Sequence, residues 1–169
     1  LATSLSAINK KTLLIDADPQ GNASTGIGIS YENRRPNLYD LIVNEALDLN
    51  AIKKTIVPDL DIITANTNLA ASEIELADVK NREFVLLNIL SKIEGYDYIL
   101  IDCPPALGLL TINSLVASQS IIIPLQSEFF ALEGISSLVN SIELIRSNFN
   151  PNLFIEGILL TMVDKRNSL

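Results

Sequence analysis

The fold is decided by two short stretches, TLLID at residues 12–16 and YILID at residues 98–102. Each is an apolar run of strand length that ends on an aspartate, and such continuous runs are typical of strands covered on both faces. Three further blocks complete the set of predicted strands: Asp61–Thr64, Ser120–Pro124 and Glu156–Thr161. Helical patterns separate these blocks. The sequence therefore predicts a three-layer, Rossmann-like α/β fold with a mostly parallel sheet.

Apolar residues recur at helical spacing in two stretches between the strands. One covers residues 135–149 and ends at Asn150 and Pro151. The other runs from about residue 70 to residue 93, with a predicted break near residues 80–82 and a stop at Gly95. Both stretches place one apolar stripe on a helix, as expected for helices that pack onto a sheet.

Both ends of the chain suggest a partial domain. Residues 1–9 resemble the last turns of an amphipathic helix, without an N-cap before them, and lead directly into the strand at residue 12. Near the other end, the apolar residues 157–163 are followed by only six more. We therefore expect residues 1–169 to form a single α/β domain that is incomplete at both ends.

The composition narrows the class of protein. Hydrophobic residues make up 48% of the chain, enough for a substantial core, but no apolar run approaches the roughly 20 residues of a membrane span. The net charge of −8 disfavours a nucleic-acid surface, and the pairs of basic residues are interpreted as solvated termini and loops. These pairs are Lys10/Lys11, Arg34/Arg35, Lys53/Lys54 and Lys165/Arg166.

The chain carries one cysteine, Cys103, and no histidine. An internal disulfide is therefore impossible and a structural zinc site is effectively excluded. No segment has the basic region, apolar run and cleavage site of a secretory signal, so we expect a cytoplasmic location without membrane attachment.

Carboxylates follow two of the predicted strands. Asp16 ends the first strand, Asp18 comes two residues later, and Asp102 ends the strand at residues 98–102. Ligands of open α/β sheets bind beyond the carboxyl ends of the strands, where such side chains can hold Mg²⁺ on a nucleotide. If the extended backbone persists, Asp16 and Asp18 point the same way. The alternative is that each aspartate only caps a helix or starts a turn.

The segment after Asp16 is built to turn. Pro19 fixes its backbone φ, and Gly21 can adopt conformations that side chains forbid. Such a loop suits a switch that responds to a γ-phosphate, but it equally suits an ordinary strand-to-helix connection.

Four stretches together resemble the ParA/Soj partitioning ATPases, a deviant Walker family that includes MinD. They occur in family order: LLIDADPQGNASTG at residues 13–26, YDYILIDCPPALGLLTIN at 96–113, PLQSEFFALEG at 124–134 and GILLTMVDKR at 157–166. The resemblance implies a P-loop NTPase fold, ATP and Mg²⁺ as cofactors, and an ATP-sandwich homodimer. It further implies non-specific DNA binding on the nucleoid through parts outside this chain, and a ParB-type partner that stimulates hydrolysis during chromosome or plasmid segregation.

The resemblance also implies roles for the carboxylates. Asp18 matches the acidic residue needed for hydrolysis, either as a base or as a group that orients water. Asp102 matches the Walker B aspartate that holds Mg²⁺, usually through water, and Asp16 matches a supporting catalytic and metal-site carboxylate.

Other loops match the nucleotide vicinity. Pro104, Pro105 and Gly108 match the loop after Walker B, where backbone amides sense the γ-phosphate, although a simple turn before a helix has the same pattern. Glu128 lies in a loop that approaches nucleotide and partner subunit, and Asp164 matches a position near the base edge, or is merely a solvated strand end.

The sequence departs from the family by an absence. No GKT or GKS occurs, so the first strand, the phosphate-binding loop and the C-terminal part are expected to lie outside this chain, and the chain alone should bind ATP poorly and be inactive. The alternative is a truncated relative that acts as a non-catalytic interaction module. A single cysteine disfavours the nitrogenase iron protein, the DPQGN and DCPP segments disfavour MinD, and no G-x-G-x-x-G supports a dehydrogenase.

Overall fold

The computed structural model describes residues 1–126 and 131–162, with side chains throughout these ranges except at residues 131–137. Its contacts divide the chain into two units, residues 1–117 and 118–169, and each unit is described by itself. The expectation of a single domain stays a prediction.

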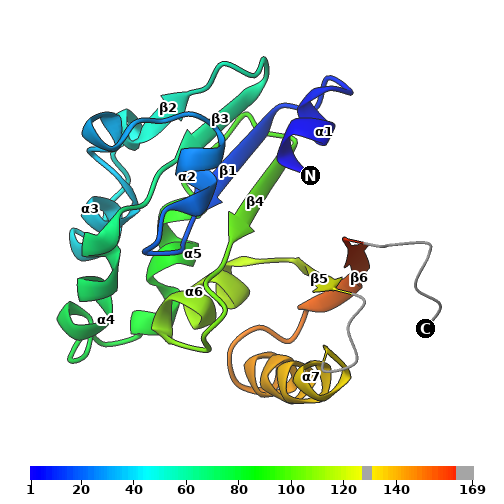
Figure 1. Cartoon of the computed structure of the whole chain (residues 1–169). Helices are drawn as coiled ribbons and strands as arrows, with labels where there is room; N and C mark the ends of the chain where they lie inside the picture. The colour runs from blue at the N-terminus through cyan, green and yellow to red at the C-terminus, as the bar shows by residue number, and fades with distance from the viewer. Residues whose placement is uncertain (127–130, 163–169) are drawn as a thin grey trace. The chain divides into compact units, whose positions relative to one another are not determined.

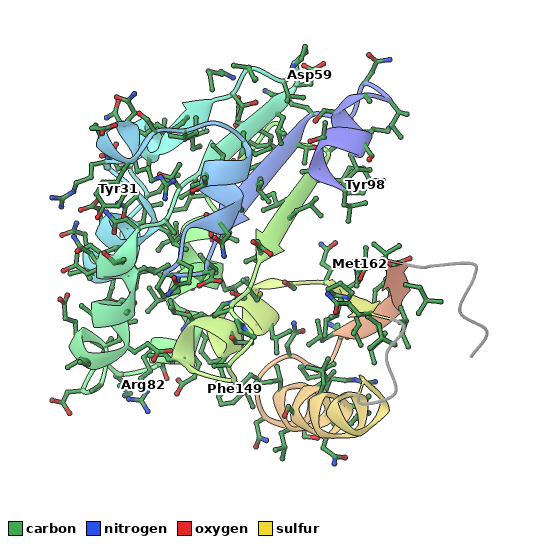
Figure 2. All side chains as sticks on the ribbon, viewed as in Figure 1. Tyr31, Asp59, Arg82, Tyr98, Phe149 and Met162 are labelled. Carbon is green, nitrogen blue, oxygen red and sulfur yellow. The ribbon has the colours of Figure 1, made fainter. Side chains whose placement is uncertain are left out.

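The first unit is built on a four-stranded sheet with the order β2-β3-β1-β4 (Figure 1). Strand β1 (Thr12–Asp16) lies between β3 (Leu60–Ile63) and β4 (Tyr98–Asp102), and both neighbours run parallel to it. The two stretches TLLID and YILID therefore form adjacent strands with the predicted bounds. Figure 2 labels Asp59 and Tyr98, which lie where β3 and β4 begin.

The edge strand β2 (Ile52–Lys54) was not predicted. It pairs antiparallel with β3, and it contains Lys53 and Lys54, which were expected in a loop. Lys54 Nζ lies 2.7 Å from the carboxylate of Asp61, a nearly buried residue of β3. Three residues with two lysines give too short and too polar a pattern to indicate a strand.

The rest of the first unit consists of short helices and the loops between them. The α-helices are α1 (Ala2–Ser6), α2 (Asn22–Gly26), α3 (Leu38–Val43), α4 (Ser72–Glu75), α5 (Val85–Leu90) and α6 (Leu109–Ala117). The 3-10 helices are η1 (Tyr31–Asn33), η2 (Leu49–Ala51), η3 (Thr67–Ala71) and η4 (Arg82–Phe84). The predicted break near residues 80–82 is confirmed, because Asn81 takes a left-handed conformation with φ of 58°.

The core of the first unit joins the sheet to three of these helices. Leu13 and Ile15 of β1 are fully buried and belong to one cluster with residues of α3, α5 and α6. Because successive side chains of a strand alternate, these two residues share one face of the sheet. A capping box fixes the start of helix α3: the Asn37 side chain accepts the backbone N–H of Tyr39 at 3.0 Å, and the Asp40 side chain accepts the backbone N–H of Asn37 at 2.9 Å.

The second unit is a βαβ arrangement. Strands β5 (Ser120–Gln126) and β6 (Phe154–Thr161) pair in parallel, and α7 (Ala131–Asn148) connects them. Both predicted strands are confirmed, although β5 and β6 extend slightly beyond the predicted residues 120–124 and 156–161. Ile142 and Ile145 of α7 are buried, as expected for the apolar stripe of a packed helix. Among the described residues, no helix is long and apolar enough to cross a membrane.

Candidate functional site

Two of the predicted site carboxylates lie side by side at the carboxyl ends of β1 and β4. Asp16 and Asp102 are register partners of these parallel strands, and the next residue, Ala17, donates its backbone N–H to the Asp102 carbonyl at 2.8 Å. Both strands end at the same edge of the sheet, the edge at which open α/β sheets bind ligands.

Asp16 is fully buried and its carboxylate is held inside the protein. Its Oδ2 accepts hydrogen bonds from the backbone N–H of Ser24 at 2.7 Å and from the Ser24 hydroxyl at 2.6 Å. The same hydroxyl oxygen accepts the N–H of Ala65 at 3.1 Å, which follows β3. Asp16 thereby satisfies an otherwise unpaired amide at the start of α2, so the helix-capping alternative describes part of its role.

Asp18 sits in a tight turn that follows directly on β1. The residue is half-buried, its Oδ1 accepts the N–H of Gln20 at 2.9 Å, and its carbonyl accepts the N–H of Gly21 at 2.9 Å. Gly21 has a φ of +65°, the left-handed region that favours glycine. Because β1 ends at Asp16, the condition for a continuous strand alternation between Asp16 and Asp18 is not met.

The other two carboxylates act on Asp102. Burial of its carboxyl group and the charges of Asp16 and Asp18 raise the pKa of Asp102 above its ordinary value. The residue is still exposed to solvent, so a ligand can reach it. Three like charges in one neighbourhood create a demand for a positive partner. Within residues 1–126 and 131–162, no three acidic or cysteine side chains form a ready metal-binding group.

The loop after β4 lines a pocket together with the turn after β1. The pocket has a volume of about 160 Å³, and its lining residues are Pro19, Ala70, Glu73, Pro104, Ala106, Gly108 and Leu110. Thr111 stabilises this loop by donating its hydroxyl to the carbonyl of Ala106 at 2.6 Å. Two predicted site residues, Pro104 and Gly108, therefore lie at one cavity with the residue that follows Asp18.

Sequence reasoning missed three residues that organise this edge: Ser24, Glu73 and Arg34. Glu73 of α4 accepts the backbone N–H of Leu110 at 3.2 Å, near the start of α6. The interpretation of Arg34 as a solvated residue is wrong, because only 6% of it is exposed. Helical or strand periodicity does not indicate these contacts, because their partners lie between 5 and 41 positions away. Glu128 and Asp164 lie outside the described residues.

Comparisons with known proteins match nearly the whole chain. A family model described as an AAA domain covers residues 1–155. The chromosome partitioning protein ParA of Caulobacter vibrioides is 48% identical over 172 residues, which is all of this chain and 64% of that protein. The sporulation initiation inhibitor protein Soj of Bacillus subtilis is 48% identical over 170 residues, again all of this chain and 67% of that protein. The chain thus spans about two thirds of the length of these relatives.

Solved structures agree with the fold. The structure of cobyrinic acid a,c-diamide synthase from Mycobacterium smegmatis, with bound ADP and magnesium, matches with a TM-score of 0.92 at 31% identity. The match covers 98% of this chain and 68% of the synthase chain. A plasmid partition protein from Borrelia burgdorferi has a TM-score of 0.79 at 27% identity, over 98% of this chain and 72% of its own. These matches confirm the predicted P-loop-type α/β fold with a mostly parallel sheet. With the identity to ParA and Soj over its whole length, the chain belongs to the ParA/Soj family of chromosome-partitioning ATPases.

Proposed function

We propose that the intact protein binds ATP with Mg²⁺ and hydrolyses it at the edge formed by the ends of β1 and β4. The observation that carries this proposal is the gathering of Asp16 and Asp102 in register with Asp18 close by. A polyphosphate with its cation is the ligand that such an edge suits, because the cation offsets the repulsion among the carboxylates.

The donor set fits magnesium rather than a softer metal. Mg²⁺ prefers oxygen ligands, keeps several waters and is usually bound by one or two carboxylates together with the substrate phosphates. The site offers one exposed carboxylate, Asp102, beside two others. This set suits Mg²⁺, which does not need the protein to supply all of its ligands. The cobyrinic acid a,c-diamide synthase structure, which contains ADP and magnesium, supports the same assignment for this chain.

The residues divide the work in this proposal. Asp102 would hold the Mg²⁺ ion through water. The bound ion would neutralise charge on the phosphates. Asp16 supports that carboxylate and the turn behind it, and Asp18 positions the attacking water. Pro104 and Gly108 belong to the loop after β4, whose backbone amides would bind the γ-phosphate when nucleotide is present. Glu128 and Asp164 complete the nucleotide vicinity by resemblance alone.

The cellular role follows from the family. We infer that the full-length protein forms an ATP-sandwich homodimer and binds DNA non-specifically on the nucleoid, within the cytoplasm. We further infer that a ParB-type partner stimulates its ATPase during chromosome or plasmid segregation. The 48% identity to ParA and Soj supports this role.

The test compares three forms of the full-length protein: wild type, Asp18→Ala and Asp78→Ala. Asp78 is an exposed aspartate in the turn after α4, so its variant controls for the loss of one surface carboxylate. We expect slow ATP hydrolysis by the wild type and by Asp78→Ala. Asp18→Ala should lose turnover by roughly a hundredfold or more, because water is no longer positioned, while it retains ATP binding.

Two outcomes would contradict the proposal in different ways. Rapid hydrolysis by Asp18→Ala would remove Asp18 from its role but leave the enzyme. Absence of both ATP binding and hydrolysis from the wild-type protein would refute the enzyme itself and favour the non-catalytic interaction module.

A further inference from the structure

Arg34 is a buried guanidinium group without a carboxylate partner among the described residues. It is 6% exposed, and it takes part in none of the ion pairs within residues 1–126 and 131–162. Burying a charge is costly unless the group is fully hydrogen-bonded. The position of Arg34 therefore requires an explanation from its hydrogen bonds.

The guanidinium donates five hydrogen bonds, all to neutral oxygen atoms. Nη1 donates to the carbonyls of Gly21 at 3.3 Å and Ala65 at 3.2 Å. Nη2 donates to the hydroxyl of Thr25 at 2.7 Å, and both Nε and Nη2 donate to the carbonyl of Ile29 at 3.3 Å. Every nitrogen of the side chain has a partner, which matches the five donors of an arginine.

The acceptors of these hydrogen bonds belong to two separate segments of the fold. Gly21, Thr25 and Ile29 belong to the segment that follows Asp18 and includes α2, whereas Ala65 lies just after β3. Arg34 thus connects this segment to the sheet. The face of Tyr31 lies over the guanidinium, with its ring centroid 5.7 Å from Cζ, and closes the arrangement.

The contact at Gly21 reaches the predicted catalytic turn. The N–H of Gly21 donates to the carbonyl of Asp18 at 2.9 Å, while the carbonyl of Gly21 accepts from Arg34. Gly21 therefore links the guanidinium to the backbone of Asp18 through its own two hydrogen bonds. Displacement of Gly21 would move the turn that carries the Asp18 carboxylate.

We propose that Arg34 is a positioning residue, which fixes the turn of Asp18 for water activation without touching nucleotide or water itself. This inference rests on the proposed ATPase function. An arginine is required because its planar fork reaches the oxygens of Gly21, Thr25, Ile29 and Ala65 at once. A lysine has one nitrogen and cannot span acceptors on two sides of the group.

The experiment uses the full-length protein and the variants Arg34→Lys, Arg34→Ala and Arg35→Ala. Arg35 is the matched control, because it is the next residue and also an arginine, but its side chain is 64% exposed and pairs with Asp40 at 2.7 Å. We expect kcat to fall about tenfold in Arg34→Lys and further in Arg34→Ala, with KM for ATP changed by less than about threefold, since misplacement of a catalytic group affects turnover. Arg35→Ala should retain the wild-type kcat.

Hydrogen exchange of the nucleotide-free protein provides a readout that does not depend on activity. In both Arg34 variants the amide of Gly21 should exchange at least about tenfold faster, whereas the amide of Leu14 in β1 keeps its protection. Arg35→Ala should change neither amide.

Several results would overturn the proposal. Folded Arg34 variants with wild-type kcat, or with unchanged exchange at Gly21, would show that Arg34 does not control the turn. Failure of both variants to fold would make Arg34 a general core residue instead. If the wild type lacks ATPase activity, the proposed function fails and any catalytic role of Arg34 fails with it, whereas an active wild type with unaffected Arg34 variants refutes only this inference.

Discussion

Replacing Gly21 with alanine tests how tightly the turn after β1 is held. Gly21 has a φ of +65°, and a Cβ atom at this position would lie 3.0 Å from the Ala65 carbonyl oxygen and would overlap Arg34 Nη1. Two penalties therefore add at this position. The left-handed conformation costs an alanine about 1–2 kcal/mol, and crowding against packed neighbours costs about 1–3 kcal/mol more. We expect Gly21→Ala to lower the free energy of unfolding by about 2–5 kcal/mol.

Two nearby glycines separate these penalties. Gly28 also has a positive φ, of +88°, but a Cβ atom there would meet nothing within 4 Å, so Gly28→Ala should show the conformational cost of about 1–2 kcal/mol alone. Gly26 ends α2 without a positive φ and faces open space. Gly26→Ala should therefore be neutral or stabilising by up to about 1 kcal/mol.

Urea unfolding of the full-length protein, followed by circular dichroism, measures all three variants under the same conditions. The decisive quantity is the difference between Gly21→Ala and Gly28→Ala, which isolates the contact with Arg34 and Ala65. A difference below about 0.5 kcal/mol would refute the claim that the guanidinium packs against this turn.

Two further predictions concern hydrogen bonds to the buried carboxylates of Asp16 and Asp61. Urea unfolding measures both. Asp16→Ala should cost about 2–3 kcal/mol, because the buried N–H and hydroxyl of Ser24 lose their acceptor, and a cost below about 1 kcal/mol would contradict this. Burial and a 2.7 Å hydrogen bond to Asp61 raise the pKa of Tyr96 above its ordinary value of 10.0. The folded state therefore holds this proton more tightly, so the contribution is complete below about pH 10 and is lost as the pH rises further. Stability should fall more steeply above about pH 10 in the wild type than in Tyr96→Phe, and equal slopes would contradict the shift.

The sequence predicted those elements whose own residues carry a clear apolar pattern. β1 and β4 were predicted with their observed bounds, because each is an apolar run of strand length that ends on an aspartate. Coverage on both faces was expected of such runs, but only β1 is largely buried, and no residue of β4 is. The helical pattern over residues 70–93 was predicted with its break near residues 80–82, but not with the shortness of the helices on either side of Asn81, α4 and α5. Edge strand β2 was not predicted, because its pairing with β3, rather than its own residues, makes it a strand.

Sequence analysis identified the carboxylates of the candidate site, but not the residues that hold them in place. An aspartate that ends an apolar strand can be recognised from local sequence, as Asp16 and Asp102 were. Arg34 gives no such signal, because its acceptors lie 5 to 31 positions away and a basic pair is ordinarily solvated. Glu73 reaches Leu110 across 37 positions, and only the fold brings them together.

The environments of the three aspartates differ, and this difference supports the division of roles proposed above. Asp16 is fully buried, and its Oδ2 already accepts two hydrogen bonds from Ser24, so its charge is offset within the protein. Asp18 accepts the N–H of Gln20 and remains half-exposed on its turn. In the described part of the chain no hydrogen bond reaches the Asp102 carboxylate, while its two neighbours repel its charge. A cation therefore lowers the energy of Asp102 most and that of Asp16 least, which argues for Asp102 as the carboxylate that faces Mg²⁺ and for Asp16 as the support behind it.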